Sequence, residues 1–138
     1  MKITVPQNVG GELKVLPEGT CRAAIEGVSV GKTSEGKPKA TVRYICLTEM
    51  YPKDSGMTSI GERILETFSL QPQALWNING LFKEATGGNI PQGDYEDTDI
   101  QEILEDNLKG SEWDLVLATE LTPKGEEQTR VSARELAK

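Results

Sequence analysis

The sequence contains no histidine, only two cysteines and few aromatic residues. Phe, Trp and Tyr make up 5% of the 138 residues, and the two cysteines do not form a CxxC pair. Without histidine, catalysis by a Ser-His or Cys-His couple is excluded, and the usual zinc sites lack their ligands. We therefore expect a protein that is not an enzyme and that has no cofactor and no bound metal.

Long apolar segments are absent as well. No run approaches the roughly 20 apolar residues that a membrane-spanning helix needs. The N-terminal stretch "MKITVPQNVGGELKVLPEG" has neither an apolar signal core nor a small-residue cleavage site. We therefore expect a cytoplasmic location and no membrane partner. The length fits one domain, and residues 1–138 are expected to fold as a single unit.

Alternation of apolar and polar residues predicts five strands. They are expected at residues 20–30, 39–49, 63–70, 111–121 and 128–136. Gly27 interrupts the first strand and predicts a bulge or bend. The first two strands should form an antiparallel hairpin. Cys21 and Cys46 fall on this hairpin, where we expect buried free thiols that could be neighbours in the sheet.

Two helices are predicted between the third and fourth strands. The first begins at Pro72, which suits a first helical position, and ends at Gly87. The second is capped by Asp97 or Thr98 and ends at Gly110. A mainly β chain of five strands, with its helices after the third, is compatible with a five-stranded OB-like antiparallel barrel. An antiparallel sheet covered by two helices is the alternative.

Charge is distributed unevenly along a chain whose net charge is −7. Residues 1–63 carry nine Lys and Arg against seven Asp and Glu, whereas residues 64–138 carry six against fifteen. Such an imbalance indicates a polarised surface. The stretch "VGKTSEGKPKATVRY" holds many of the cations. It is not a phosphate-binding P-loop, because the required upstream glycine is missing and a strand follows instead of a helix.

The acidic residues gather in the second half of the chain. The densest cluster comprises Asp94, Glu96, Asp97, Asp99, Glu102, Glu105 and Asp106. Such carboxylates could hold a divalent metal ion, but their spacing matches no EF-hand loop. A solvated acidic face is the favoured interpretation.

Cations beside exposed aromatic rings are what the binding of a single-stranded nucleic acid requires. The predicted nucleic-acid-binding residues are Arg22, Lys32, Lys37, Lys39, Arg43, Tyr44, Tyr51, Lys53 and Arg63. The cations would contact phosphates, and Tyr44 or Tyr51 would stack on a base. The rings of Phe68, Trp76, Phe82 and Trp113 are expected in the core. A solvated hairpin that binds nothing is the alternative.

Four short motifs resemble a known family. They are "LPEGTC" with Pro17 and Gly19, "SEGKP" with Ser34, Gly36 and Pro38, "ATG" with Ala85 and Gly87, and "LKG" with Leu108 and Gly110. Through them the chain resembles small phage-encoded proteins of replication and recombination modules, which are treated as single-stranded DNA-binding proteins. The resemblance implies an OB-like fold and binding of single-stranded DNA. Cys21 stands where that family commonly has an aromatic residue, so no stacking is expected there.

The favoured hypothesis is a non-catalytic protein that protects or organises single-stranded DNA during replication or recombination, in the cytoplasm of a bacterial host. Single-stranded DNA is the expected partner. Replication or recombination proteins and further copies of the chain are open as additional partners. The main alternative is a phage structural or protein-interaction module whose acidic face meets a basic partner. An enzyme with a carboxylate-bound metal is a third hypothesis, weakened by the lack of histidine.

Overall fold

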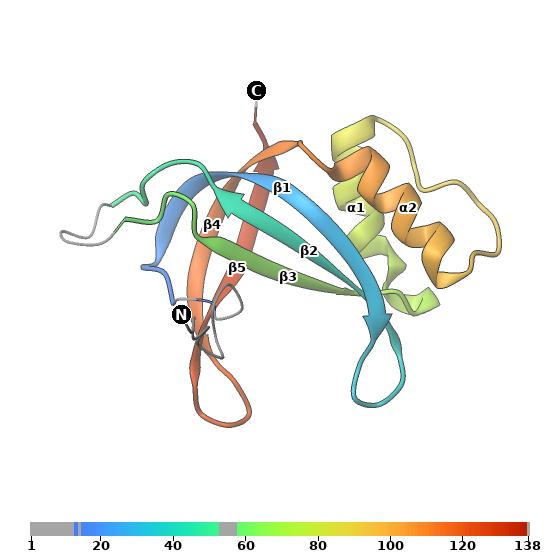
Figure 1. Ribbon diagram of the computed structural model, residues 1–138, viewed down its shortest axis with the longest axis horizontal. Helices are drawn as coiled ribbons and strands as arrows, with labels where there is room; N and C mark the ends of the chain where they lie inside the picture. Colours follow the sequence, from blue (N-terminus) through green and yellow to red (C-terminus); the bar gives the residue numbers. More distant parts are fainter. Residues whose placement is uncertain (1–12, 14, 53–57, 138) are drawn as a thin grey trace, which may run out of the picture.

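One antiparallel sheet of five strands and two helices make up the computed structural model, which describes residues 13, 15–52 and 58–137 (Figure 1). The strands are β1 (Gly19–Lys32), β2 (Pro38–Cys46), β3 (Arg63–Ser69), β4 (Glu112–Leu121) and β5 (Glu127–Leu136). A short 3₁₀ turn, η1 (Pro72–Ala74), leads into α1 (Leu75–Thr86), and α2 (Asp97–Leu108) follows. The predicted order of elements is confirmed.

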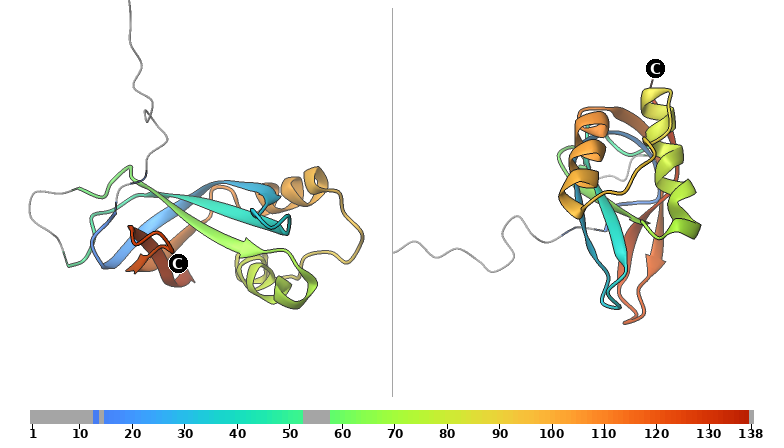
Figure 2. Two further views of the ribbon diagram at one scale, coloured as in Figure 1. Left: turned by 90° about the horizontal axis from the view of Figure 1, so that it is seen from below. Right: turned by 90° about the vertical axis from the view of Figure 1, so that its right-hand side faces the viewer.

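The sheet is strongly curved, and both helices lie together at one end of it (Figures 1 and 2). Its strand order is β3-β2-β1-β4-β5. The register of β1 against β2 shifts between Ile25 and Gly27, so the predicted bulge is confirmed. Only the first half of β1 pairs with β4, from Gly19 to Ala24. The long hairpin of β1 and β2 therefore extends beyond β4.

Side chains of α2 cover the edge of β1 that β4 leaves free. The Val30 N–H donates to Gln101 Oε1 at 2.9 Å, and the Val28 N–H donates to Glu105 Oε1 at 3.4 Å. These contacts satisfy backbone donors that would otherwise form an open sheet edge. They also fix α2 beside the second half of β1.

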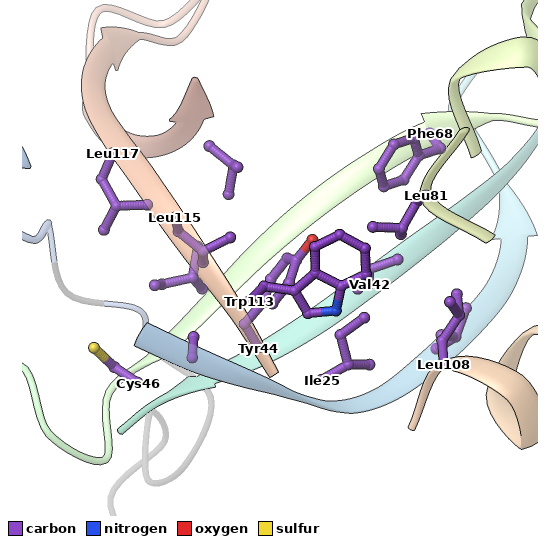
Figure 3. Close-up of a cluster of buried hydrophobic side chains, with 14 of the residues drawn as sticks. Ile25, Val42, Tyr44, Cys46, Phe68, Leu81, Leu108, Trp113, Leu115 and Leu117 are labelled. Carbon is purple, nitrogen blue, oxygen red and sulfur yellow. The ribbon is translucent and has the colours of Figure 1, made fainter. Parts of the chain in front are cut away.

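The hydrophobic core fills the concave side of the sheet (Figure 3). Alternate residues of each strand point inward, and Tyr44 and Trp113 are fully buried at its centre. The predicted burial of Phe68, Phe82 and Trp113 is confirmed. Burying one such large side chain contributes about 1.5–3 kcal/mol, so the core is the main source of stability.

Cys21 and Cys46 lie side by side in this core, as the sequence suggested. Both are buried and free. Their side chains share a hydrogen bond, which together with burial raises the pKa of the Cys21 thiol. The Cys46 thiol also donates to the Thr48 carbonyl oxygen at 3.2 Å.

The C-terminal end of α1 agrees with the sequence, but α1 begins at Leu75 instead of Pro72, which starts the 3₁₀ turn, and the start of α2 also differs. Gly87 ends α1 in the left-handed conformation, with φ +84°, as predicted. The helix α2 begins one residue earlier than its predicted cap allows: Glu96 is the N-cap, and its side chain makes no capping hydrogen bond. The predicted cap at Asp97 or Thr98 is therefore wrong. Asp97 and Asp99 instead lie in the first turn, where negative charge suits the helix dipole.

The edges of the sheet are β3 and β5, and no hydrogen-bonded ladder joins them among the described residues. The expected barrel closure is thus not confirmed. Side chains bridge the opening instead. Glu66 of β3 accepts a hydrogen bond of 2.7 Å from the Tyr44 hydroxyl and another of 2.7 Å from Arg134 Nη1 of β5. The Arg134 guanidinium lies 5.0 Å from the centre of the Phe68 ring.

Removing the Glu66 carboxylate should destabilise the fold. Glu66→Ala leaves the buried Tyr44 hydroxyl without its acceptor and Arg134 without its anion, at a cost of about 3 kcal/mol. Glu66→Gln keeps an acceptor for Tyr44 and should cost less. Urea unfolding measures both changes, and Glu126→Ala at the exposed β4–β5 turn serves as the control, with an effect below about 0.5 kcal/mol. Equal stability of Glu66→Ala and the control would contradict the bridging role.

Candidate nucleic-acid interface

The tip of the β1–β2 hairpin is a structured turn that places lysines at the surface. A backbone hydrogen bond of 2.8 Å from Thr33 to Lys37 closes the turn. Lys32 and Lys37 are exposed at its two ends, and Lys39 follows on the outer face of β2. Lys37 Nζ lies 3.7 Å from Glu35, whereas neither Lys32 nor Lys39 forms an ion pair in the part of the chain that the structure describes. The tip therefore carries an excess of positive charge.

Two arginines continue this charge along the outer face of β2 and β3. Arg43 points outward from β2 opposite Leu65, and Arg63 occupies the neighbouring row on β3. One carboxylate holds both guanidiniums: Arg43 Nε donates to Glu26 at 3.0 Å, and Arg63 Nε donates to it at 3.2 Å. The basic face, as we define it, consists of Lys32, Lys37, Lys39, Arg43 and Arg63.

Glu26 is the anion that organises the two arginines. Burial alone would raise its pKa, but the hydrogen bonds from Arg63 and Arg43 outweigh burial and hold the pKa of Glu26 below its ordinary value. The carboxylate is therefore ionised at neutral pH. Since Nε is the donor in both contacts, the Nη groups of each arginine can serve a second anion, such as a phosphate.

The acidic helix α2 borders the basic face on one side only. Its Gln101 and Glu105 contact the backbone of β1, and β2 and β3 lie on the far side of that strand, although the Glu105 carboxylate and the Arg43 guanidinium come close to each other beside Gly27. The predicted acidic cluster lies along this helix and the loop before it, exposed except for the half-buried Glu105. No group of three or more potential metal ligands comes together within the described residues. An anion would thus meet the basic face from the side of β2 and β3.

Arg22 and Tyr51 lie at the opposite end of β1. The Arg22 guanidinium pairs with Asp114 of β4 at 3.0 Å, and its hydrogen bond lowers the pKa of Asp114. Tyr51 forms a bridge with Thr20 and is 78% exposed. Thr20 and Lys32 are separated by about 40 Å along the strand, at about 3.3 Å per residue. Arg63 is aligned through Ile45 with Ala24, two residues from Arg22, so the predicted cations run along the outer face from the hairpin tip towards the end that carries Tyr51.

Close backbone packing holds Tyr51 in place. Gly19 has φ +146°, and a Cβ at this position would overlap the Tyr51 carbonyl oxygen. The backbones of Thr20 and Tyr51 exchange two hydrogen bonds of 2.8 Å. Tyr51 thus presents its ring to solvent from a fixed backbone.

Two predictions about aromatic rings are wrong. Tyr44 is fully buried, with its hydroxyl on Glu66, so its ring cannot stack on a base. Trp76, expected in the core, is 71% exposed. Of the two tyrosines proposed for stacking, only Tyr51 offers a ring to solvent. Lys53, the remaining predicted contact, lies outside the described residues.

Sequence reasoning missed two residues that matter here. Glu26 was not singled out, because its role depends on the register that aligns it with Arg43 and Arg63. Trp76 could have been placed correctly. At 100° per residue it lies about 160° around α1 from Ile78, which is the centre of the buried stripe.

The pKa of Glu26 should respond to its arginines. Arg43→Gln combined with Arg63→Gln removes both favourable hydrogen bonds, so burial then raises the pKa of Glu26. In the native protein the folded pKa is lowered, so the stabilisation is present above the ordinary glutamate pKa and is lost as pH falls through the folded value. Carboxyl-carbon NMR titration measures the shift. Arg22→Gln, which affects Asp114 instead, should leave Glu26 unchanged; an unaltered Glu26 in the double variant would contradict the arrangement.

Within the part of the chain that the structure describes, no helix has the length and apolar character needed to cross a membrane. In comparisons with known proteins, no family model and no curated protein matches this chain.

Proposed function

We propose that this protein binds single-stranded DNA, without catalysis, through the basic face. The observation that supports this most is the grouping of five cations on one side of an acidic chain, with Glu26 and Glu35 as their paired anions. The cations would contact successive phosphates, and release of counterions would drive binding. The role is protection or organisation of single strands in replication or recombination, as the motif resemblance implies.

The arrangement of the strands supports an OB-like mode of binding. OB-folds bind oligonucleotides on the face of strands two and three and with the loops that join strands one to two and four to five. Here the basic face occupies β2, β3 and the β1–β2 turn. The β4–β5 turn, with exposed Lys124 at its tip, projects to the same side of the molecule (Figures 1 and 2). We propose that the DNA strand passes between these two turns.

The spacing of the cations fits an extended polyanion. Outward residues of one strand recur about every 6.6 Å, so Lys39 and Arg43 are about 13 Å apart along β2. The paired arginines are already aligned by Glu26, which reduces the entropy lost when they bind phosphate. Tyr51 would stack on a base only where a long strand continues along β1 toward Arg22.

Reversing two charges at the hairpin should weaken DNA binding. Lys37→Glu combined with Lys39→Glu should lower the affinity for oligo-dT at least about tenfold at about 50 mM salt. The salt slope should fall by about 1.4, since each lost phosphate contact on a single strand contributes about 0.7. Fluorescence titration at about 50 mM and about 200 mM salt measures both quantities.

The matched control for this double variant has the same change in net charge. Lys83→Glu combined with Lys109→Glu alters exposed lysines outside the basic face and should leave the salt slope unchanged. Equal affinity of the wild type and the hairpin variant for oligo-dT would refute the proposed mechanism. Absence of any oligo-dT binding by the wild type would refute the function.

Neutralising Glu26 should strengthen DNA binding. Glu26→Gln removes a negative charge that repels an incoming phosphate, while the amide oxygen can still accept from both Nε groups and keep the arginines aligned, so the affinity for oligo-dT should rise about threefold to tenfold. Glu102→Gln makes the same change of charge on the exposed surface of α2 and serves as the control. Equal effects of the two substitutions would indicate a response to net charge alone and would contradict a role for the arginine pair.

A further inference from the structure

A second surface feature lies at the helical end of the molecule. A pocket of about 440 Å³ opens between α1 and the loop that leads into α2. Its apolar lining consists of Leu70, Leu75, Trp76, Ile90, Tyr95 and Ile100. The volume lies within the range of about 300–1,000 Å³ that is typical of binding sites for small ligands. None of these residues belongs to the basic face.

The floor and the rim of this pocket differ in exposure. Leu70, Ile90 and Ile100 are half-buried and pack against the core. The rim is exposed: Trp76 is 71% and Tyr95 is 36% accessible. Large aromatic side chains around an apolar depression are the residues that most often dominate the energy of protein–protein binding. The pocket therefore has the make-up of a recognition site.

Side-chain hydrogen bonds hold the wall of the pocket in place. Asn79 of α1 accepts from the Ile90 N–H at 2.9 Å, and its Nδ2 donates to Asn89 Oδ1 at 3.1 Å. The Tyr95 hydroxyl donates to the Pro91 carbonyl oxygen at 2.7 Å. The loop is thus tied to the helix at one end and folded back on itself at the other. A partner would not have to order it, which favours binding.

The charge near the pocket indicates the charge of the partner that it would favour. Residues 84–108 contain eight carboxylates and no lysine or arginine. Asp94, Glu96, Asp97 and Asp99 do not line the pocket, but they are exposed on the loop next to Tyr95 and in the first turn of α2. The nearest cation in the sequence is Lys83, two helical turns from Trp76. A ligand here meets an apolar floor beside an anionic loop and helix start.

We infer that this pocket binds a segment of a partner protein in which a large apolar side chain is flanked by lysine or arginine. The apolar side chain enters between Trp76 and Tyr95, and its basic neighbours meet the exposed carboxylates of the adjacent loop and of the first turn of α2. A DNA base would also stack on Trp76, but its phosphates would face the same carboxylates. The β1–β2 turn of a second copy is basic, but its residues 33–37 include no large apolar side chain to enter the pocket. The inference does not rest on DNA binding by the basic face.

Peptide selection tests the inference on the full-length protein. A display library of random dodecapeptides is selected on the wild type, and enriched peptides are titrated by fluorescence anisotropy. We expect enriched peptides to combine an aromatic or branched apolar residue with flanking lysine or arginine. Trp76→Ala should weaken them at least about tenfold. Tyr51→Ala, which removes an equally exposed ring at the other end of the molecule, should have no effect.

A charge-neutralising variant and a DNA titration provide two further tests. Asp94→Asn combined with Glu96→Gln should weaken the same peptides and reduce their salt dependence, without removing an apolar contact. Absence of enrichment, or enriched peptides that are indifferent to both sets of substitutions, would overturn the inference. If Trp76→Ala weakened oligo-dT as strongly as the hairpin variant does, the pocket would belong to a nucleic-acid site and the inference would also fail. Circular dichroism verifies that each variant is folded.

Discussion

The Glu66 carboxylate holds together the two edges of the sheet, and the shape of the molecule depends on this contact. It accepts hydrogen bonds from Tyr44 in the core and from Arg134 on the opposite edge, while Arg134 covers the Phe68 ring. Burial raises the pKa of Glu66, and the bonds from Tyr44 and the charge of Arg134 oppose that rise. A carboxylate at this depth is stabilising only when both partners are present. No backbone ladder closes the opening in the described chain, so these side chains connect the two edges of the curved sheet.

An acidic protein can bind a polyanion because charge acts locally in salt solution. At physiological ionic strength the screening length is about 8 Å, so carboxylates more distant than this have little influence on the basic face. The fold separates the two kinds of charge in that way. The acidic cluster lies on α2 and its preceding loop, whereas the basic face lies on β2, β3 and the β1–β2 turn. Glu26 and Glu105 are exceptions: Glu26 aligns Arg43 and Arg63, and Glu105 of α2 meets the Arg43 guanidinium beside Gly27.

The two proposed sites differ in the interactions that would drive binding, and they occupy different elements. The basic face is polar, and its affinity for DNA would depend on salt. The pocket of Trp76 and Tyr95 is apolar and lies beside an anionic loop, so a protein segment fits it better than a nucleic acid does. A protein with both sites could hold a DNA strand and a basic partner at the same time. The two ligands would not compete, because no residue is shared between the sites.

The sequence by itself determined the number, order and type of the elements, since period-two alternation, helical spacing and glycine turns are local signals. It also located the Gly27 bulge and the buried Trp113. Alternation with Lys39, Thr41 and Arg43 also places Tyr44 on the apolar face of β2, so its burial could have been predicted. The sequence could not show that one carboxylate serves Arg43 and Arg63, because that depends on the register of three strands. The alignment of the predicted cations across the outer face of the first three strands, the opening between β3 and β5, and the pocket beside α1 were decided only by tertiary structure. Each depends on contacts between residues that are distant in the chain, and local patterns carry no information about such contacts.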